Sequence, residues 1–209
     1  MIESLYYNKI SYLYFIISYL LGSIPVGYIL FRYFKKDDIR NYGSGNIGAT
    51  NVNRLLGKKL GFITLSIDMS KTILVTFLAY KFLGMDYGIY CGAFSVVGHI
   101  FPVWLKFKGG KGVACFIGLL AIVSWPLFIM FLALWLISVK IFRYSGVGAI
   151  FSIIMNLVIF KSLLILQFNY SILLFIPGNP NEFTVILVIS LLILAKHQQN
   201  IKKILKKKI

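Results

Sequence analysis

The chain has 209 residues, of which 59% are hydrophobic and only 13% are charged, and its mean hydropathy is +0.84. This composition excludes an ordinary soluble globular domain, which needs far more polar surface. The net charge of +16 would suit a nucleic-acid-binding protein, but the basic residues form clusters between apolar stretches. We therefore predict a membrane protein without a nucleic-acid partner.

Seven apolar stretches are predicted to cross the membrane as helices, which satisfy their own backbone polar groups in lipid. The first, residues 11–31, is too long for a secretory signal and lacks a small-residue cleavage site, so we expect it to stay in the mature protein. The others are residues 62–83, 87–105, 113–123, 127–141, 147 to about 166, and 183–195. Pro126 favours a break between the fourth and fifth stretches. Residues 167–176 either extend the sixth span or lie at the outer interface.

Four clusters between these spans hold most of the 22 Lys and Arg residues: 32–59, 106–111, 140–143 and 196–208. The positive-inside rule places all four in the cytoplasm, so the N-terminus lies outside and the C-terminus lies on the cytoplasmic side. We expect an all-α integral membrane protein with a single domain over residues 1–209. It is a bundle of about seven transmembrane helices, some short, with glycine-rich cytoplasmic loops.

The first loop, residues 43–54, contains a formal G-x-G-x-x-G pattern. A dinucleotide site would need a preceding strand, whereas a membrane span and a charged stretch precede this one, so we reject that assignment. The glycines allow a ligand to approach the backbone, and Arg54 can bind a phosphate through two hydrogen bonds. The polar side chains beside it are Ser44, Asn46, Thr50 and Asn51. The same residues also fit a polar turn with an arginine on the cytoplasmic side.

The second loop, residues 98–113, carries Lys108, Gly109, Gly110, Lys111 and Gly112 immediately before a span. Glycines and lysines that open a helix form a nest of amides at the positive end of a dipole, which resembles a phosphate cradle. It is not a Walker A loop, because Leu105 stands at the first glycine position and no Ser or Thr follows the lysine. His99 is more typical of a structural histidine near a span end.

The tail begins with His197 and Asn200, which lie three residues apart and would share one side of a helix at the cytoplasmic end of the last span. Both could meet a substrate, and His197 is one of two plausible bases near neutral pH, with His99. The lysines at 202–208 are better explained by anionic lipid head groups.

Asp68 and Lys71 lie inside the second span, where a charged side chain usually has a structural or functional role. A structural ion pair across one helical turn is the favoured interpretation, and the alternative is that Lys71 reaches toward the site. Cys91 and Cys115 have no metal-ligand spacing, so we assign them packing roles.

These segments together resemble the bacterial acyl-phosphate:glycerol-3-phosphate acyltransferase family, PlsY type. Residues 43–71, 98–114 and 194–201 are similar to its three motifs, in order, over nearly the whole chain. The resemblance implies transfer of a fatty acyl group from acyl phosphate to the 1-hydroxyl of glycerol 3-phosphate, giving lysophosphatidate and phosphate. It implies no cofactor or metal, and a soluble partner enzyme that makes acyl phosphate. Ser44, Arg54, His197 and Asn200 would be catalytic, and substrate would be bound by Asn46, Thr50, Asn51, Lys108, Gly109, Gly110, Lys111 and Gly112.

The chain departs from the family pattern in two places. Lys203 stands where an arginine is common, and no Gly-x-Glu follows it, so a structural carboxylate is absent from the motif. After Arg143 and Tyr144 the family often has serines, whereas here Ser145 is followed by Gly146. Any substrate contact assigned to those serines does not carry over.

Two other classes of function compete with an acyltransferase. A transporter of a phosphorylated metabolite would also need a basic, glycine-rich site, but its site should lie near the bilayer midplane rather than in cytoplasmic loops. A non-catalytic assembly protein explains the basic tail but not three polar loops. The acyltransferase hypothesis requires the loops and the tail to converge on one pocket for two anionic substrates.

Overall fold

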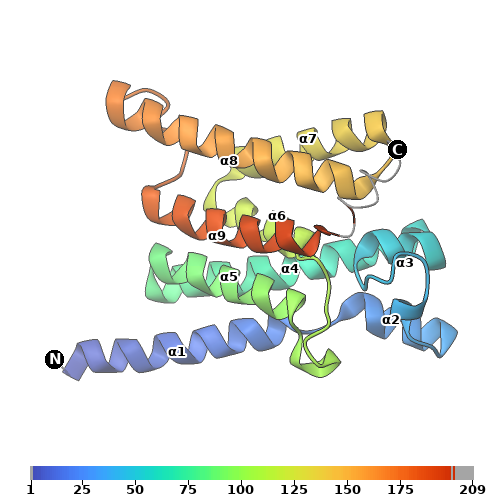
Figure 1. Ribbon diagram of the computed structural model, residues 1–209. Helices are drawn as coiled ribbons and strands as arrows, with labels where there is room; N and C mark the ends of the chain where they lie inside the picture. Colours follow the sequence, from blue (N-terminus) through green and yellow to red (C-terminus); the bar gives the residue numbers. More distant parts are fainter. Residues whose placement is uncertain (1, 199, 201–209) are drawn as a thin grey trace. The chain divides into compact units, whose positions relative to one another are not determined.

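The computed structural model describes residues 2–198 and 200 of the chain, and all regular structure in them is helical (Figure 1). The helices gather into two compact units, Met1–Leu119 and Leu120–Ile209. This confirms the predicted all-α class. The expectation of a single domain over residues 1–209 stays a prediction, and each unit is described by itself below.

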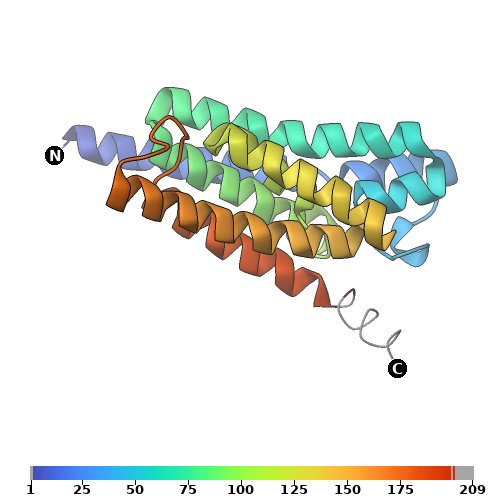
Figure 2. The ribbon, with the colours of Figure 1, turned by 90° about the horizontal axis from the view of Figure 1, so that it is seen from above.

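The first unit is built around α5 (Met85–Ile100), which packs against α1 (Ile2–Gly22) and α4 (Lys58–Leu83) (Figures 1 and 2). Small residues permit this close packing, as is common between membrane helices. A Cβ atom on Gly98 would lie 2.2 Å from the Tyr19 carbonyl oxygen of α1. The remaining elements are α2 (Val26–Lys35), η1 (Ile39–Asn41), α3 (Ala49–Leu56), η2 (Val103–Leu105) and the start of α6 (Val113–Val123).

The first predicted span is broken rather than continuous. The chain leaves the helix between Gly22 and Val26, so the expectation of one helix over residues 11–31 is wrong. Pro25 has no amide hydrogen and cannot continue the hydrogen-bond ladder. The break leaves the Ile24 carbonyl available to another element, and Lys71 of α4 donates a hydrogen bond to it. Within the third predicted span the α-helix α5 ends at Ile100, before Pro102, and a short 3-10 helix completes the segment to Leu105.

The second unit contains α7 (Trp125–Phe142), α8 (Ser145–Tyr170) and α9 (Pro180–Lys196), and α8 packs against both of the others. Pro126 lies in the first turn of α7, which confirms the predicted break. Of the segment 167–176, for which the sequence allowed two alternatives, residues 167–170 extend helix α8. A capping box begins α9: Asn179 Oδ1 accepts a hydrogen bond from the Glu182 amide, and Glu182 Oε2 accepts one from the Asn179 amide, both 2.9 Å.

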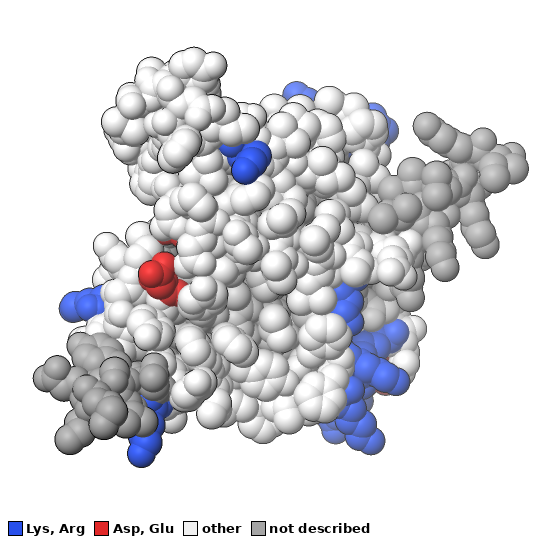
Figure 3. Space-filling model, turned by 60° about the vertical axis from the view of Figure 1, so that its left-hand side comes forward, with Lys and Arg blue, Asp and Glu red and all other residues white. Residues whose placement is uncertain are grey.

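Five helical segments of the described residues are long and apolar enough to span a membrane. They are Lys9–Lys35, Lys58–Leu83, Met85–Leu105, Trp125–Phe142 and Ser145–Tyr170. The other two predicted spans correspond to the shorter helices Val113–Val123 and Pro180–Lys196. The face drawn in Figure 3 is mostly uncharged, with Lys and Arg in a few separate groups. Large apolar side chains such as Phe62, Phe77 and Leu136 are exposed, as expected for a multi-pass protein in lipid.

Candidate active site

The first loop is held together by the side chain of Asn51, which is only 2% exposed. Its Oδ1 accepts hydrogen bonds from the Ser44 amide (3.0 Å) and from Nη1 of Arg54 (3.2 Å). Its Nδ2 donates to the carbonyl oxygens of Tyr42 (3.1 Å) and Asn46 (2.9 Å). An amide has two donors and an oxygen that accepts about two bonds, so Asn51 is fully used inside the protein. These bonds set the shape of the loop and orient Arg54, and the contact of Asn51 with substrate stays a prediction.

Glycine is required at Gly43 for two reasons. Its φ of +61° lies in the left-handed region, and a Cβ atom there would lie 2.3 Å from Oδ1 of Asn51. Gly43 therefore allows the buried amide to reach the loop backbone. Ser44 and Arg54 remain exposed on the outer side of this loop, where they can meet a ligand.

A small apolar core joins the first loop to the second. It consists of Phe31, Ile39, Ile47, Val52 and Leu105. Ile47 and Val52 belong to the first loop, whereas Leu105 belongs to the second. The two predicted substrate loops are thus anchored on one cluster, although about fifty residues of sequence separate them.

An ion pair lies beside the first loop. Oδ2 of Asp38 accepts a hydrogen bond from Nη2 of Arg40 at 2.5 Å, and the guanidinium lies 5.6 Å from the centre of the Tyr28 ring. The hydrogen bonds from Arg40 hold the pKa of Asp38 below its ordinary value of 3.8. Asp38 therefore stays ionised and neutralises Arg40, while the charge of Arg54 is not matched by a carboxylate among the hydrogen bonds of the described loop.

The second loop differs from the amide nest that the sequence predicted. The amides of Lys108, Gly109 and Gly110 donate to the carbonyl oxygens of Leu105, Ile100 and His99, at 3.0 to 3.2 Å. These three amides are therefore not available to an anion. The amides of Gly112 and Val113 have no backbone partner in the described residues, and α6 begins at Val113, as the sequence predicted.

Gly109 and Gly110 are needed because the loop packs directly on the end of α5. A Cβ atom on Gly109 would lie 2.3 Å from the His99 carbonyl oxygen, and one on Gly110 would lie 2.1 Å from Nε2 of His99. Lys108 is exposed and Lys111 is half-buried at the start of α6. The paired glycines thus serve packing, and the lysines supply the charge.

Three ionisable side chains meet beneath this loop: Asp68 and Lys71 of α4 and His99 of α5, which are 1%, 9% and 4% exposed. Nζ of Lys71 lies 2.8 Å from Oδ1 of Asp68, which confirms the predicted ion pair. The contact does not have the angles of a hydrogen bond. The same amine donates to the Ile24 carbonyl oxygen at 3.0 Å and lies 3.1 Å from Nδ1 of His99, at hydrogen-bond distance. The sequence singled out His99 as a structural histidine or a base, but not as a neighbour of this pair, because only the fold brings α5 to α4.

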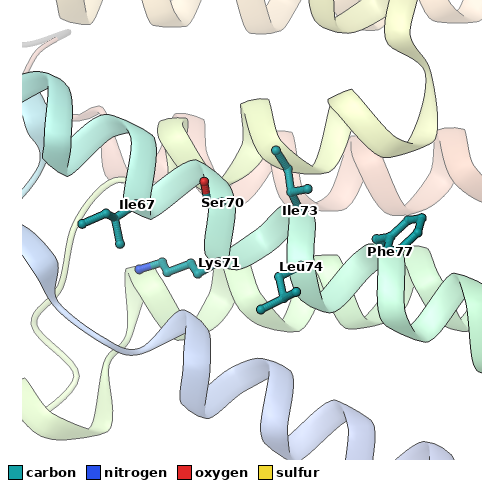
Figure 4. Close-up of a pocket in the computed structure, with 6 residues that line it drawn as sticks. All are labelled: Ile67, Ser70, Lys71, Ile73, Leu74 and Phe77. Carbon is teal, nitrogen blue, oxygen red and sulfur yellow. The ribbon is translucent and has the colours of Figure 1, made fainter.

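An open apolar groove of about 480 Å³ runs along α4 from the ion pair (Figure 4). It is lined by Ile67, Ser70, Lys71, Ile73, Leu74 and Phe77. Figure 4 shows the Lys71 amine pointing away from Leu74 and Phe77. Lys71 therefore contacts both the groove and His99, and His99 in turn packs against the second loop at Gly110.

The tail residues belong to the second unit. His197 ends α9 with its side chain 2% exposed, and its Nδ1 lies 2.8 Å from the Ile193 carbonyl oxygen. A carbonyl oxygen only accepts, so Nδ1 carries the hydrogen and Nε2 of the neutral ring holds the lone pair.

Asn200 packs on the start of α8. Its Oδ1 accepts a hydrogen bond of 3.5 Å from the Tyr144 hydroxyl, and a Cβ atom on Gly146 would lie 2.2 Å from its Nδ2. Glycine at position 146, where the family pattern differs, therefore accommodates Asn200. The departure at Lys203 lies outside the described residues.

The first unit thus anchors on one apolar cluster the two loops that carry the predicted residues Ser44, Asn46, Thr50, Arg54, Lys108 and Lys111. His197 and Asn200 are grouped in the second unit. The convergence of the two groups on one pocket remains a prediction.

Comparison with known proteins identifies the family of the chain. A family model described as glycerol-3-phosphate acyltransferase matches residues 12–207. The glycerol-3-phosphate acyltransferase of Ehrlichia canis is 42% identical over 194 residues, 92% of this chain and 94% of that protein. That of Bartonella henselae is 40% identical over 200 residues, 93% of this chain and 88% of that protein.

Two crystal structures of PlsY (YgiH), an integral membrane glycerol 3-phosphate acyltransferase, are similar in fold. The glycerol 3-phosphate form has a TM-score of 0.82 at 34% identity, and the lysophosphatidic acid form has 0.80 at 32%. Both comparisons cover 94% of this chain and 92% of the solved one.

Proposed function

The chain belongs to the glycerol-3-phosphate acyltransferase family, and we propose that it transfers a fatty acyl group from acyl phosphate to the 1-hydroxyl of glycerol 3-phosphate. The products are lysophosphatidate and inorganic phosphate. The observation that carries the proposal is the anchoring of the arginine loop and the lysine loop on one core, because two anionic substrates need two sources of positive charge side by side. This reaction is the first acylation of phospholipid synthesis.

The phosphate of the acceptor is bound by the first loop. Arg54 is exposed, carries a planar guanidinium suited to two phosphate oxygens, and is oriented by Asn51. The Ser44 hydroxyl lies on the same exposed stretch, and Asn46 and Thr50 flank it. We assign Asn51 a positioning role, since its four hydrogen bonds are all internal.

The phosphate of the donor is bound by the second loop. Lys108 and Lys111 supply charge, and the amides of Gly112 and Val113 at the start of α6 supply hydrogen-bond donors. Gly109 and Gly110 contribute by letting the loop lie against α5.

The acyl chain of the donor lies in the groove of α4. The groove wall is almost entirely apolar, and it begins at Lys71, whose amine contacts His99 below the second loop. A donor with its phosphate at this loop can therefore extend its chain along Leu74 and Phe77 without leaving the lipid phase.

The transfer itself needs one proton acceptor. The acceptor hydroxyl oxygen attacks the acyl carbon, the bond from that carbon to the phosphate oxygen breaks, and phosphate leaves with the electron pair. The hydroxyl proton goes either to Nε2 of His197, whose lone pair is fixed by the Nδ1 hydrogen bond to Ile193, or to an oxygen of the departing phosphate. Phosphate is a good leaving group, so positioning of the two substrates supplies much of the acceleration.

We assign the site to the cytoplasmic side of the bacterial inner membrane, with the N-terminus outside and the C-terminus inside. The four basic clusters support this orientation. A soluble enzyme that makes acyl phosphate would supply the donor, and lipids surround the chain.

A comparison of acyl donors tests the proposal against the transporter alternative. Purified protein in lipid nanodiscs receives glycerol 3-phosphate with acyl phosphate, acyl-coenzyme A or an acyl carrier protein thioester of the same chain length. We expect lysophosphatidate with acyl phosphate alone. Equal use of a thioester would overturn the assignment of the donor, and failure with all three donors would favour the transporter.

A further inference from the structure

We propose that the tip of the second loop, residues 103–107, inserts into the head-group region of the membrane and binds anionic lipid there. Trp104 and Phe107 enter the interface, and Lys106 binds lipid phosphates. The inference concerns residues that are assigned above to neither substrate. It does not depend on which acyl donor the protein uses.

The tip exposes large aromatic side chains at the end of a span. Trp104 is 60% exposed and Phe107 is 58% exposed, whereas Leu105 between them belongs to the apolar core that joins the two loops. The apolar segment Met85–Leu105 ends within the tip. An exposed tryptophan at a span end is typical of the membrane interface, where its ring lies at the level of the head groups.

The tip projects away from the helices that carry it. In Figure 1 the chain that follows α5, drawn in green, turns out to the side of the helix axes and passes beyond α1. The Tyr19 hydroxyl of α1 donates a hydrogen bond of 2.7 Å to the Phe101 carbonyl oxygen, which fixes the beginning of this turn to α1. Because membrane helices run roughly along the bilayer normal, a sideways projection at a span end lies along the membrane surface.

Three amides of the tip are already bonded inside the loop, so the backbone can leave water. The amides of Leu105 and Phe107 donate to the Pro102 carbonyl oxygen, at 3.1 and 2.9 Å. The Lys106 amide donates to the Val103 carbonyl oxygen at 3.3 Å. Each amide that is bonded within the protein removes the cost of taking an unsatisfied polar group into lipid.

The backbone of the tip also indicates that its side chains are used. Lys106 and Phe107 have φ values of +52° and +61°, in the left-handed region. Glycine adopts this conformation at a lower cost, and other residues rarely occupy it. The chain nevertheless places a lysine and an aromatic ring at these two positions, and both side chains are exposed.

The charge of the tip suits anionic lipid. In the described part of the chain, no ion pair or hydrogen bond engages the Lys106 amine, and the sequence has no Asp or Glu between Asp86 and Glu182. The two carboxylates beside the first loop accept hydrogen bonds from Tyr42 and Arg40. A lysine beside aromatic rings can keep its methylene stem in apolar surroundings while its amine reaches lipid phosphates.

Fluorescence of the full chain in nanodiscs tests the depth of the tip without reference to activity. The sequence has three tryptophans, so Trp125→Phe combined with Trp135→Phe leaves only Trp104. We expect lipids brominated near the head group to quench it more strongly than lipids brominated near the chain end, and aqueous acrylamide to quench it less than free tryptophan. Strong quenching by acrylamide, or strongest quenching by the deep bromines, would overturn the proposal. The acrylamide result would favour a soluble partner protein at this surface.

A spin label measures the same depth independently of tryptophan. Cys91 and Cys115 are buried, so a nitroxide attached to Phe107→Cys is the accessible label. Its relaxation should respond more to oxygen, which partitions into lipid, than to a water-soluble nickel chelate. Asn53→Cys, at an exposed position of α3, is the control and should show the reverse order. The same order at both positions would contradict insertion of the tip.

Lys106→Glu tests the preference for anionic lipid. In nanodiscs that contain phosphatidylglycerol, it should weaken the quenching of Trp104 by head-group bromines and strengthen its quenching by acrylamide. In phosphatidylcholine alone the change should be smaller, because the lipid surface carries no net charge. Lys81→Glu, at an exposed lysine in the last turn of α4, makes the same change in net charge and should have no effect. Equal changes in the two lipids, or no change for Lys106→Glu, would overturn the assignment of Lys106 to anionic lipid.

Discussion

Nη1 of Arg54 donates a hydrogen bond to Oδ1 of Asn51, and the same oxygen accepts the amide of Ser44. One buried amide thus fixes both the backbone of the first loop and the direction of its arginine. The contact preorganises Arg54 for phosphate binding, since the side chain loses less conformational freedom when the substrate binds.

Replacement of Arg54 by Ala should lower kcat/KM for glycerol 3-phosphate by roughly 100-fold or more, because the acceptor phosphate loses a two-bond ligand. Arg54→Lys should recover little of the lost activity, since an ammonium cannot bind two phosphate oxygens in the planar geometry of a guanidinium. Steady-state kinetics with varied glycerol 3-phosphate measure the effect. Arg32→Ala, at an exposed arginine that bonds Tyr28, is the matched control and should stay near normal. Near-normal kinetics for Arg54→Ala would remove this residue from the site.

Replacement of Asn51 by Ala should destabilise the first loop, because it leaves two carbonyl oxygens and one amide of the loop without their partner. Each buried polar group left unpaired costs about 1–3 kcal/mol. Thermal unfolding in detergent should show a lower midpoint, with activity lost in parallel. Asn53→Ala, at an exposed position of the same helix, serves as the control. An unchanged midpoint with a selective rise in KM would instead indicate direct contact between Asn51 and substrate.

Replacement of Gly110 by Ala should weaken donor binding, because the new Cβ atom would lie 2.1 Å from Nε2 of His99 and must push the loop away from α5. We expect a higher KM for acyl phosphate with little change in the KM for glycerol 3-phosphate. Gly48→Ala is the comparison: its φ is −78°, and the nearest atom to a Cβ there is 3.5 Å away. Similar kinetics in the two variants would mean that the loop is not held against His99.

Replacement of His197 by Ala should lower kcat by about 10²–10⁴, the usual contribution of a general base, and flatten the acid limb of the pH–rate profile. The expectation rests on the lone pair that the Nδ1 hydrogen bond leaves at Nε2. The pH dependence of kcat in both proteins measures it. Retained activity with an unchanged profile would assign the proton to the phosphate of the donor.

Changes in the groove of α4 should alter the preferred chain length. Leu74→Trp fills the groove and should favour shorter acyl phosphates, whereas Phe77→Ala lengthens it and should favour longer ones. Each buried methylene contributes about 0.8 kcal/mol, so the ratio of kcat/KM between chain lengths should change severalfold. Phe82→Ala, on the same helix but not among the groove residues, is the control. An unchanged preference in both groove variants would place the chain elsewhere.

Much of the fold could be predicted because lipid allows few solutions. Apolar runs of sufficient length became helices, and Pro126 broke the chain where its missing amide predicts. The same rule applied to Pro25 would have found the break between α1 and α2, which the continuous hydrophobicity of residues 11–31 concealed.

The chemistry of the loops was less accessible from sequence. Residue types identified Arg54 and Lys111 as candidates, but a pattern of glycines does not tell which amides are already bonded. Gly109 and Gly110 prove to be packing residues whose amides bond the end of α5. From the sequence, Asn51 could not be distinguished from the other polar residues predicted to bind substrate, and only its burial in the structure sets it apart. The ion pair of Asp68 and Lys71 followed from their spacing, whereas His99 joined it through the packing of α5 on α4.

The most direct test of a single site for two anions is the stoichiometry of the reaction. Purified protein in nanodiscs is given acyl phosphate and glycerol 3-phosphate, and lysophosphatidate and inorganic phosphate are measured together over time. The proposal predicts equal amounts of both products, each requiring both substrates. Phosphate release that does not depend on glycerol 3-phosphate, without lysophosphatidate, would contradict it.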